Sequence, residues 1–243
     1  MKIQFAIMDE RLFATKELHP QKLKDYKPDW YKNIPKVELQ AYEFEYQNKI
    51  KNVKACPSFM DIYDNSYVLL APTDYLIQVN ELGVVNWSVP ISFYEVTNKD
   101  DIGWHHHDQM ANFVDKKSNI KAVFKFHLPY KIFTPKGYSV RFHKIPFSYN
   151  DQWEACDGIL RTDKIHHLST QTLVKTNEEI FIKQGTPLVC VTPFKRETMK
   201  HETVFLPKEK KLKAKLAKNQ LRVYGGFHPN YRKAYYETST SKD

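Results

Sequence analysis

Three segments decide the fold: KIFTPKGYSVRF (131–142), DGILRTDKIHHL (157–168) and IFIKQGTPLVCVTPFKR (180–196). Apolar runs of strand length alternate in them with Pro-Lys-Gly, Asp-Gly and Gln-Gly-Thr-Pro, which are turn-forming combinations. A repeated rhythm of short strands and tight turns is typical of β-sandwiches and β-barrels. The stretch from Lys131 to Arg196 therefore predicts a compact, mainly β domain, but it names no reaction.

Working outward from this stretch, the same pattern predicts other elements. CPSFMDIYDNS (56–66) predicts a short helix with Ser58 as its N-cap. Residues 19–36 predict a surface crossing with one helical turn, and residues 98–119 a polar loop. Leu82-Gly83 suits a hairpin turn. Strands are predicted at 3–8, 38–50, 67–72, 75–80, 84–89, 91–97, 121–128, 130–134, 138–143, 158–161, 171–175, 179–183 and 187–192.

The length and composition allow one large β domain with appendages. The chain has 243 residues, 42% hydrophobic and 14% aromatic, so it can bury a core that offsets chain entropy. The net charge of +9 is concentrated at the C-terminus, where residues 207–243 hold ten Lys/Arg against three Asp/Glu. Residues 1–206 are nearly neutral, which argues against a nucleic-acid footprint over the whole surface. We therefore expect one β-rich domain over 1–206, with an N-terminal elaboration over 1–66, and a separate basic arm over 207–243.

The cysteines and the N-terminus indicate a reducing, non-secretory context. Cys56, Cys156 and Cys190 are odd in number and contain no CxxC pair, so neither a zinc site nor a disulfide framework is indicated. Cys190 lies in the apolar run LVCVTPF and is expected in the core. MKIQFAIMDERLF becomes charged too early for a signal peptide, and no apolar run has the length of a membrane span.

The segment GWHHHDQM (103–110) holds the most concentrated candidate chemistry. His106 and Asp108 form an H-x-D pair whose side chains share one side of an extended segment. With His166 or His167 as a distal ligand, they would supply the two imidazoles and one carboxylate of an iron(II) oxygenase site. Lys183, Lys195 or Arg196 would then pair with a carboxylate cosubstrate. The alternative is a loop of solvated surface histidines, and both interpretations remain open.

For the other polar residues of the β region, a role in a turn is the default interpretation and a ligand contact is the alternative. Asp163 follows a strand and could be a ligand, a cap or a turn residue. Asp157-Gly158 and Gly185-Thr186-Pro187 are predicted to form turns. A further hypothesis is a barrel that binds a small nucleotide, with phosphate contacts from Lys136, Arg141 and Arg196.

The C-terminal arm also allows two interpretations. Leucines 212, 216 and 221 recur at roughly helical spacing among lysines, and the pattern stops at Gly225-Gly226, which is typical of a helix end. A packed helix with a solvated face is one reading. The other is an arm that contacts nucleic acid or another subunit. Its candidate contact residues are Lys211, Lys215, Tyr231, Arg232, Tyr235 and Tyr236.

Several of these motifs together resemble an uncharacterised family of tailed-phage proteins. The resemblance rests on TPKGYSV (134–140), DGI-x-x-TD (157–163), KQGTPLVCVTPFKRE (183–197), PDWYKNIP (28–35), VKACPSFMD (53–61) and the His105-to-Gln109 step. It spans roughly residues 26 to 200 and marks Gln109 as a further candidate ligand contact. It implies a cupin-like or jelly-roll β fold and a viral origin, hence the host cytoplasm or the virion. The family expects an aromatic-proline strand where this chain has HHLSTQTLV (166–174).

The expected fold is therefore mainly β: a cupin-like or jelly-roll sandwich or barrel with an N-terminal α/β elaboration and a C-terminal helical arm. The leading functional hypothesis is a binding or structural component that acts through its barrel and basic arm. Its expected partner is a protein or a second copy, with nucleic acid through the arm and no membrane. The alternatives are an iron(II)-dependent oxygenase using His106, Asp108 and His166, and a small-nucleotide binding or sequestering protein.

Overall fold

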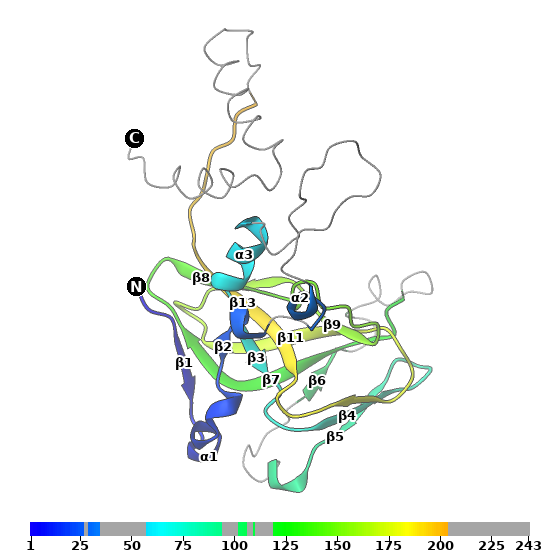
Figure 1. Cartoon of the computed structure of the whole chain (residues 1–243). Coiled ribbons are helices and arrows are strands. Elements are labelled where there is room, and N and C mark those ends of the chain that lie inside the picture. The colour runs from blue at the N-terminus through cyan, green and yellow to red at the C-terminus, as the bar shows by residue number, and fades with distance from the viewer. Residues whose placement is uncertain (27–28, 35–56, 94–101, 106–108, 110–118, 204–243) are drawn as a thin grey trace. The chain divides into compact units, whose positions relative to one another are not determined.

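The computed structural model describes residues 1–26, 29–34, 57–93, 102–105, 109 and 119–203 (Figure 1). Contacts divide the chain into two units: unit 1 comprises 1–26 and 65–196, and unit 2 comprises 27–64 and 197–243. All described strands belong to unit 1 and pair antiparallel. The prediction of a mainly β protein is confirmed.

The strands of unit 1 form three sheets (Figure 1). The first has the order β1, β7, β11, β9, with β6 also paired to β7: Gln4–Ile7, Ala122–Phe133, His167–Val174, Trp153–Ala155 and Ile102–Trp104. The second has the order β10, β8, β13, β3, β2: Gly158–Leu160, Tyr138–His143, Pro187–Lys195, Tyr67–Leu70 and Gln21–Lys22. The third has the order β12, β4, β5: Ile180–Ile182, Tyr75–Val79 and Val85–Ser88. None of these sheets closes on itself through the described strands, so the sandwich alternative fits and the barrel does not.

Short helices occur in both units. Unit 1 contains α1 and two 3-10 turns, η1 and η2: Glu10–Ala14, Lys16–Leu18 and Leu23–Tyr26. Asp9 caps α1, because its carboxylate accepts hydrogen bonds from the backbone N–H groups of Arg11 (2.9 Å) and Leu12 (3.0 Å). Unit 2 contains α2 and α3: Asp29–Asn33 and Pro57–Asp64. None of the described helices is long and apolar enough to cross a membrane.

The core of unit 1 is built on β7. Its even-numbered residues from 122 to 132 are buried and its odd-numbered residues are mostly half-buried, as a strand with one core-facing side requires. Phe124 and Phe126 pack edge to face, with ring centroids 4.9 Å apart, and Phe126 packs similarly on Tyr75 of the third sheet. Buried residues of all three sheets join one cluster, so the sheets share a single core.

One buried hydroxyl anchors the N-terminal segment to this core. Tyr130 of β7 is 2% exposed and donates a hydrogen bond to the carbonyl oxygen of Leu18 in η1 (2.6 Å). Burial raises the pKa of the Tyr130 phenol well above its usual range, so the hydroxyl stays a donor. This bond fixes the turn that follows α1.

The structure merges two predicted strands into one. Strands were expected at 121–128 and 130–134, but β7 runs continuously from Ala122 to Phe133. The register with β11 shifts between His167 and Ser169, opposite Pro129. Proline has no N–H for the ladder, so a bulge absorbs it while the strand continues. β13 also passes a proline, Pro193: the pairing with β3 stops at Val191, but the pairing with β8 continues to Lys195.

The Asp157-Gly158 turn prediction is wrong. Gly158 starts β10, pairs with Phe142 of β8, and is not among the glycines with positive φ in the described residues. A Cβ at this position would collide with the Phe142 ring. The glycine is therefore required by a close ring contact. The Pro-Lys-Gly and Gln-Gly-Thr-Pro turns are confirmed, with φ of 85° at Gly137 and 82° at Gly185.

Three local predictions are corrected. Ile102–Trp104 is strand β6, although a loop was expected, because the edge of β7 is available to pair with it. Ser58 does not cap α3, since the helix already begins at Pro57, a residue suited to the first helical position. Residues 91–93 are helical, although a strand was expected over 91–97. Strand β9 was not predicted, because three residues carry too little pattern.

Some predictions fall outside the described residues. These are the strand at 38–50, the division at residue 206 and the arm over 207–243. The leucine-glycine hairpin is confirmed: Gly83 has a φ of 75°, and Asn80 and Val84 are joined by a backbone hydrogen bond of 3.1 Å.

Aromatic stacking dominates the described part of unit 2. Tyr31 stacks on Phe59 with ring centroids 5.1 Å apart, and Phe59 stacks on Tyr63 at the same distance. The Tyr31 hydroxyl donates to the sulfur of Met60 (3.2 Å). These contacts join α2 to α3 within this unit.

Candidate functional site

The structure joins Asp163 and Arg196 into an ion pair. Arg196 donates to both carboxylate oxygens of Asp163, with Nη1–Oδ1 at 2.9 Å and Nη2–Oδ2 at 2.5 Å. It also donates to the Tyr138 carbonyl oxygen (2.5 Å) and the Ser139 hydroxyl (2.7 Å). Asp163 accepts one more hydrogen bond, from the Gly137 N–H (2.9 Å). The pair ties the turn after β10 to the start of β8 and the end of β13.

Charge and hydrogen bonding stabilise both ions of this pair. The Arg196 guanidinium, and then the Gly137 N–H, hold the pKa of Asp163 well below its usual range. Asp163 in turn raises the pKa of Arg196. Side-chain exposures are 25% for Arg196 and 5% for Asp163. A ligand that used Arg196 would have to replace these internal partners, and the predicted ligand role of either residue stays a prediction.

No contact within the described residues joins the other predicted ligand residues into one site. Arg141 pairs with Asp157 on the surface (2.5 Å), with both side chains more than half exposed. Lys136 is exposed in the turn before β8, and Gln109 is exposed. Lys183 is exposed as well, at the end of the third sheet.

Of the predicted iron ligands, the structure describes His166 and its alternative His167, which begins β11 and stacks on His127. His166 is held by the backbone and by a neighbouring ring. Its Nδ1 lies 3.1 Å from the Ile132 carbonyl oxygen and 3.0 Å from that of Thr162, and its ring stacks on Phe133 with centroids 4.1 Å apart. Two carbonyl acceptors require Nδ1 to carry the proton. His106 and Asp108 lie outside the described residues, as do Lys211, Lys215, Tyr231, Arg232, Tyr235 and Tyr236. Within the described ranges, no group of three or more His, Cys, Asp or Glu could hold a metal ion.

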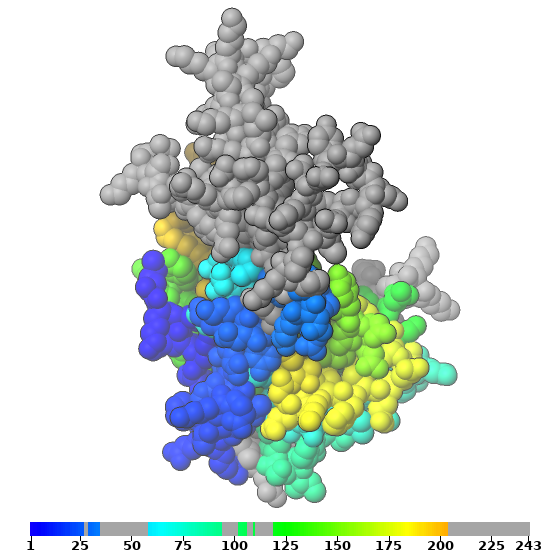
Figure 2. Space-filling view, viewed as in Figure 1, coloured from blue at the N-terminus to red at the C-terminus, as the bar shows by residue number. Residues whose placement is uncertain are grey.

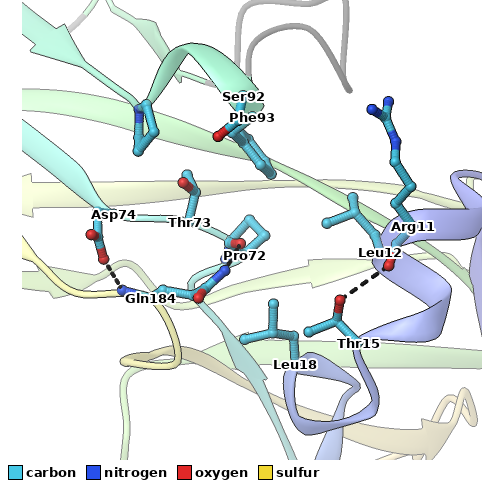
Figure 3. Close-up of a pocket in the computed structure, with 11 residues that line it drawn as sticks. Arg11, Leu12, Thr15, Leu18, Pro72, Thr73, Asp74, Ser92, Phe93 and Gln184 are labelled. Carbon is cyan, nitrogen blue, oxygen red and sulfur yellow. Dashed lines mark hydrogen bonds between the residues drawn. The ribbon is translucent and has the colours of Figure 1, made fainter.

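A cavity of about 430 Å³ in unit 1 offers a different site, named here the Thr73 pocket (Figure 3). Four segments line it: α1 with η1, the connection between β3 and β4, the residues after β5, and the turn between β12 and β13. In the space-filling view, α1 (blue) and the residues after β5 (blue-green) lie on the same face of the unit (Figure 2). The lining residues are Arg11, Leu12, Thr15, Leu18, Pro72, Thr73, Asp74, Pro90, Ser92, Phe93 and Gln184.

Backbone pairing brings these distant segments together. The Gly185 N–H donates to the Ala71 carbonyl (2.9 Å), and the Ala71 N–H donates to the Thr186 carbonyl (2.8 Å). These bonds hold the β12–β13 turn against the β3–β4 connection. The positive φ of Gly185 makes that turn possible.

Thr73 gives this pocket a buried polar group. Its side chain lines the pocket, and the residue is 5% exposed (Figure 3). Its hydroxyl makes no hydrogen bond within the described residues and is not among their buried unpaired polar atoms, so it is accessible from the pocket. A hydroxyl that opens onto a cavity can donate a hydrogen bond to a ligand there or accept one from it.

Two neighbours of Thr73 add hydrogen-bond acceptors. The Gln184 N–H donates to Oδ1 of Asp74 (2.6 Å), and the Gln184 side-chain nitrogen donates to the Pro72 carbonyl (2.9 Å). A carbonyl only accepts, so this bond fixes which end of the Gln184 amide is nitrogen. Oδ2 of Asp74 and Oε1 of Gln184 accept no hydrogen bond from the described residues.

The rest of the lining is apolar or lies at the rim. Leu12, Leu18 and Phe93 supply apolar surface, and Leu18 and Phe93 are buried. Thr15 donates its hydroxyl to the Arg11 carbonyl (3.0 Å), and the Arg11 side chain extends away from Gln184 (Figure 3). Arg11 is 66% exposed and lies 3.6 Å from the Asp9 carboxylate.

The sequence reasoning missed this pocket. The signal was present in Ala71-Pro72-Thr73-Asp74, where two polar residues sit between strands that are nearly all apolar. The predicted strands 67–72 and 75–80 leave Thr73 and Asp74 as a short connection with no assigned role. Arg11 lies 60 positions before this run and Gln184 lies 110 positions after it, so only the fold shows that they line the same pocket.

No family model and no curated protein matches the chain. Among solved structures, it is similar to a mutant dUTPase from phage phi11 of S. aureus, with 9% identity and a TM-score of 0.37, covering 86% of this chain and all of that one. It is also similar to two mutant dUTPases of Staphylococcus bacteriophage 80alpha, each at 10% identity, with TM-scores of 0.33 and 0.31. These cover 73% of this chain and 99% and 91% of theirs. Likeness at this level carries no argument about the function of this chain.

Proposed function

We propose that this chain is a small-nucleotide-binding β protein whose ligand occupies the Thr73 pocket. The observation that carries the proposal is Thr73, a residue that is only 5% exposed and whose hydroxyl opens onto the pocket that it lines. Leu12 and Phe93 provide apolar contact for a planar ring. Small-molecule sites combine apolar surface with a few convergent polar groups; this pocket has both, and its volume of about 430 Å³ falls within the usual size range.

The polar groups suit a nucleoside better than a purely apolar ligand. Hydroxyl, amide and carboxylate groups from Thr73, Gln184 and Asp74 can bond the edge of a base or the hydroxyls of a sugar. Arg11 at the rim can meet a phosphate that extends out of the cavity. Lys136, Arg141 and Arg196, the cations first considered for this function, do not line the pocket.

The first test is ligand-induced stabilisation. Nucleoside monophosphates should raise the Tm of the protein in a concentration-dependent way, because they bind the folded state. Thr73→Val removes the hydroxyl while keeping the shape, so it should weaken binding by about tenfold, whereas Thr73→Ser should retain it.

Thr198→Val is the matched control, since Thr198 is exposed and does not line the pocket. It should leave binding unchanged. If no monophosphate stabilises the protein, or if Thr73→Val binds as well as the native chain, the proposed function is wrong.

The two other functional hypotheses stay predictions. The partner-binding arm and two of the three iron ligands lie outside the described residues. No contact of the described residues favours either hypothesis over nucleotide binding in the Thr73 pocket.

A further inference from the structure

Several polar side chains that line the Thr73 pocket can only accept a hydrogen bond from a ligand. Asp74 presents Oδ2, because Oδ1 accepts the Gln184 N–H. Gln184 presents Oε1, because its amide nitrogen donates to the Pro72 carbonyl. The Thr15 hydroxyl already donates its hydrogen bond to the Arg11 carbonyl, so toward a ligand the hydroxyl oxygen can only accept. Three of the polar groups that line this pocket are thus available as acceptors.

Groups that can donate also line the pocket. Thr73 and Ser92 carry hydroxyls that can donate or accept. Arg11 donates only, but its side chain extends away from Gln184 toward the rim (Figure 3). The acceptors come from Asp74 and Gln184, which a hydrogen bond joins, and Thr73 adjoins Asp74 in the chain. A ligand that fits this end of the pocket must bring donors of its own.

We infer that the pocket selects nucleobases that carry an exocyclic amino group over bases that carry only oxo groups at that edge. This inference rests on the proposed function and names its substrate class. An amino group supplies two donors, which match Asp74 Oδ2 and Gln184 Oε1. A carbonyl oxygen at the same place would face those two acceptors with no hydrogen between them, so neither acceptor would gain a partner from the ligand.

The cytosine and uracil pair isolates this difference. The two bases have nearly the same shape, and cytosine has an amino group where uracil has an oxo group. When the two nucleotides carry the same sugar and phosphate, any difference in their affinity comes from the edge of the base. We expect deoxycytidine monophosphate to bind about tenfold or more tightly than deoxyuridine monophosphate, as loss of hydrogen bonds to a charged acceptor implies.

Asp74→Asn is the decisive variant. Asparagine keeps an Oδ1 acceptor for the Gln184 N–H, so the β12–β13 turn retains its contact. It places an amide nitrogen where Asp74 has Oδ2, which turns an acceptor into a donor. The preference for the cytosine nucleotide should then fall at least about tenfold and approach or cross parity. Asp151→Asn changes an exposed aspartate that does not line the pocket and should leave the preference unaltered.

The experiment is isothermal titration of the full chain and both variants with the two monophosphates. A cytosine preference that Asp74→Asn removes and Asp151→Asn keeps supports the inference. Equal binding of both nucleotides, or a uracil preference, overturns the inference while the proposed function stands. Binding of neither nucleotide overturns both. An Asp74→Asn protein that loses affinity equally for both nucleotides assigns Asp74 a structural role and also overturns the inference.

Discussion

Asp163 joins three parts of the second sheet although it lies in a turn. Its carboxylate accepts from the Gly137 N–H and from the guanidinium of Arg196, which also donates to the Tyr138 carbonyl. Two parallel N–H···O bonds between ions are stronger and more directional than neutral hydrogen bonds. One residue therefore fixes where β8 starts and where β13 ends.

Asp163→Asn should lower the Tm by a few degrees at neutral pH. Asparagine can still accept from Gly137, but it cannot form a two-oxygen pair with the Arg196 ion. Asp157→Asn is the matched control, because the exposed pair with Arg141 contributes little. Equal Tm values for the two variants in thermal unfolding would contradict this role of Asp163.

At the scale of elements, a glycine sets the approach of β10 to β8. Gly158 pairs with Phe142, and the phenyl ring lies where a Cβ would be. Gly103 in β6 shows the same arrangement: a Cβ there would lie 2.6 Å from Lys125 Cε and 2.8 Å from His127 Nε2. Both glycines allow side chains of a neighbouring strand to lie across the backbone.

Gly158→Ala should cost about 1–3 kcal/mol of unfolding free energy, the usual effect of overpacking. Shortening the ring should relieve the clash, so Gly158→Ala combined with Phe142→Leu should lose less than the sum of the two single variants. Denaturant unfolding of the four proteins measures this coupling. Additive losses would show that the ring does not set the requirement for glycine.

At the scale of the whole molecule, buried hydrogen-bonded groups couple stability to pH. Burial, as the largest cause, lowers the pKa of His143. Its Nδ1 lies 2.8 Å from the Lys144 carbonyl and its Nε2 lies 2.9 Å from the Thr192 hydroxyl, which is 2.6 Å from that of Ser66. The neutral ring fits this chain: Nδ1–H donates and Nε2 accepts.

Stability should therefore decline in two steps on acidification. A folded pKa below the ordinary value means that the unfolded chain binds the proton first, so the free energy of unfolding falls as pH drops below about 6.5. Asp163 adds a second decline below about pH 4 for the same reason. His143→Gln should remove the upper step and Asp163→Asn the lower one. A stability curve that is flat from pH 7 to 5 in the native chain would contradict the first step.

Much of the fold follows from local chemistry. Turn residues and strand-length apolar runs correctly placed the Gly83, Gly137 and Gly185 turns and most strands of the second and third sheets. Local sequence patterns did not predict a strand correctly where pairing with a neighbouring strand decides whether it forms or how far it extends. β6 forms because the edge of β7 pairs with it, and β7 continues past Pro129 because a bulge opposite β11 absorbs the missing donor.

The sequence by itself determined that this protein is mainly β and where its tight turns lie, because turn geometry and strand alternation depend on residues close together in the chain. Only the tertiary structure decided the site. Arg196 meets Asp163, and Gln184 meets Asp74, across 33 and 110 positions. Hydrogen bonds between distant segments leave no periodic signal, so the Thr73 pocket and its acceptors become visible only when the sheets are assembled.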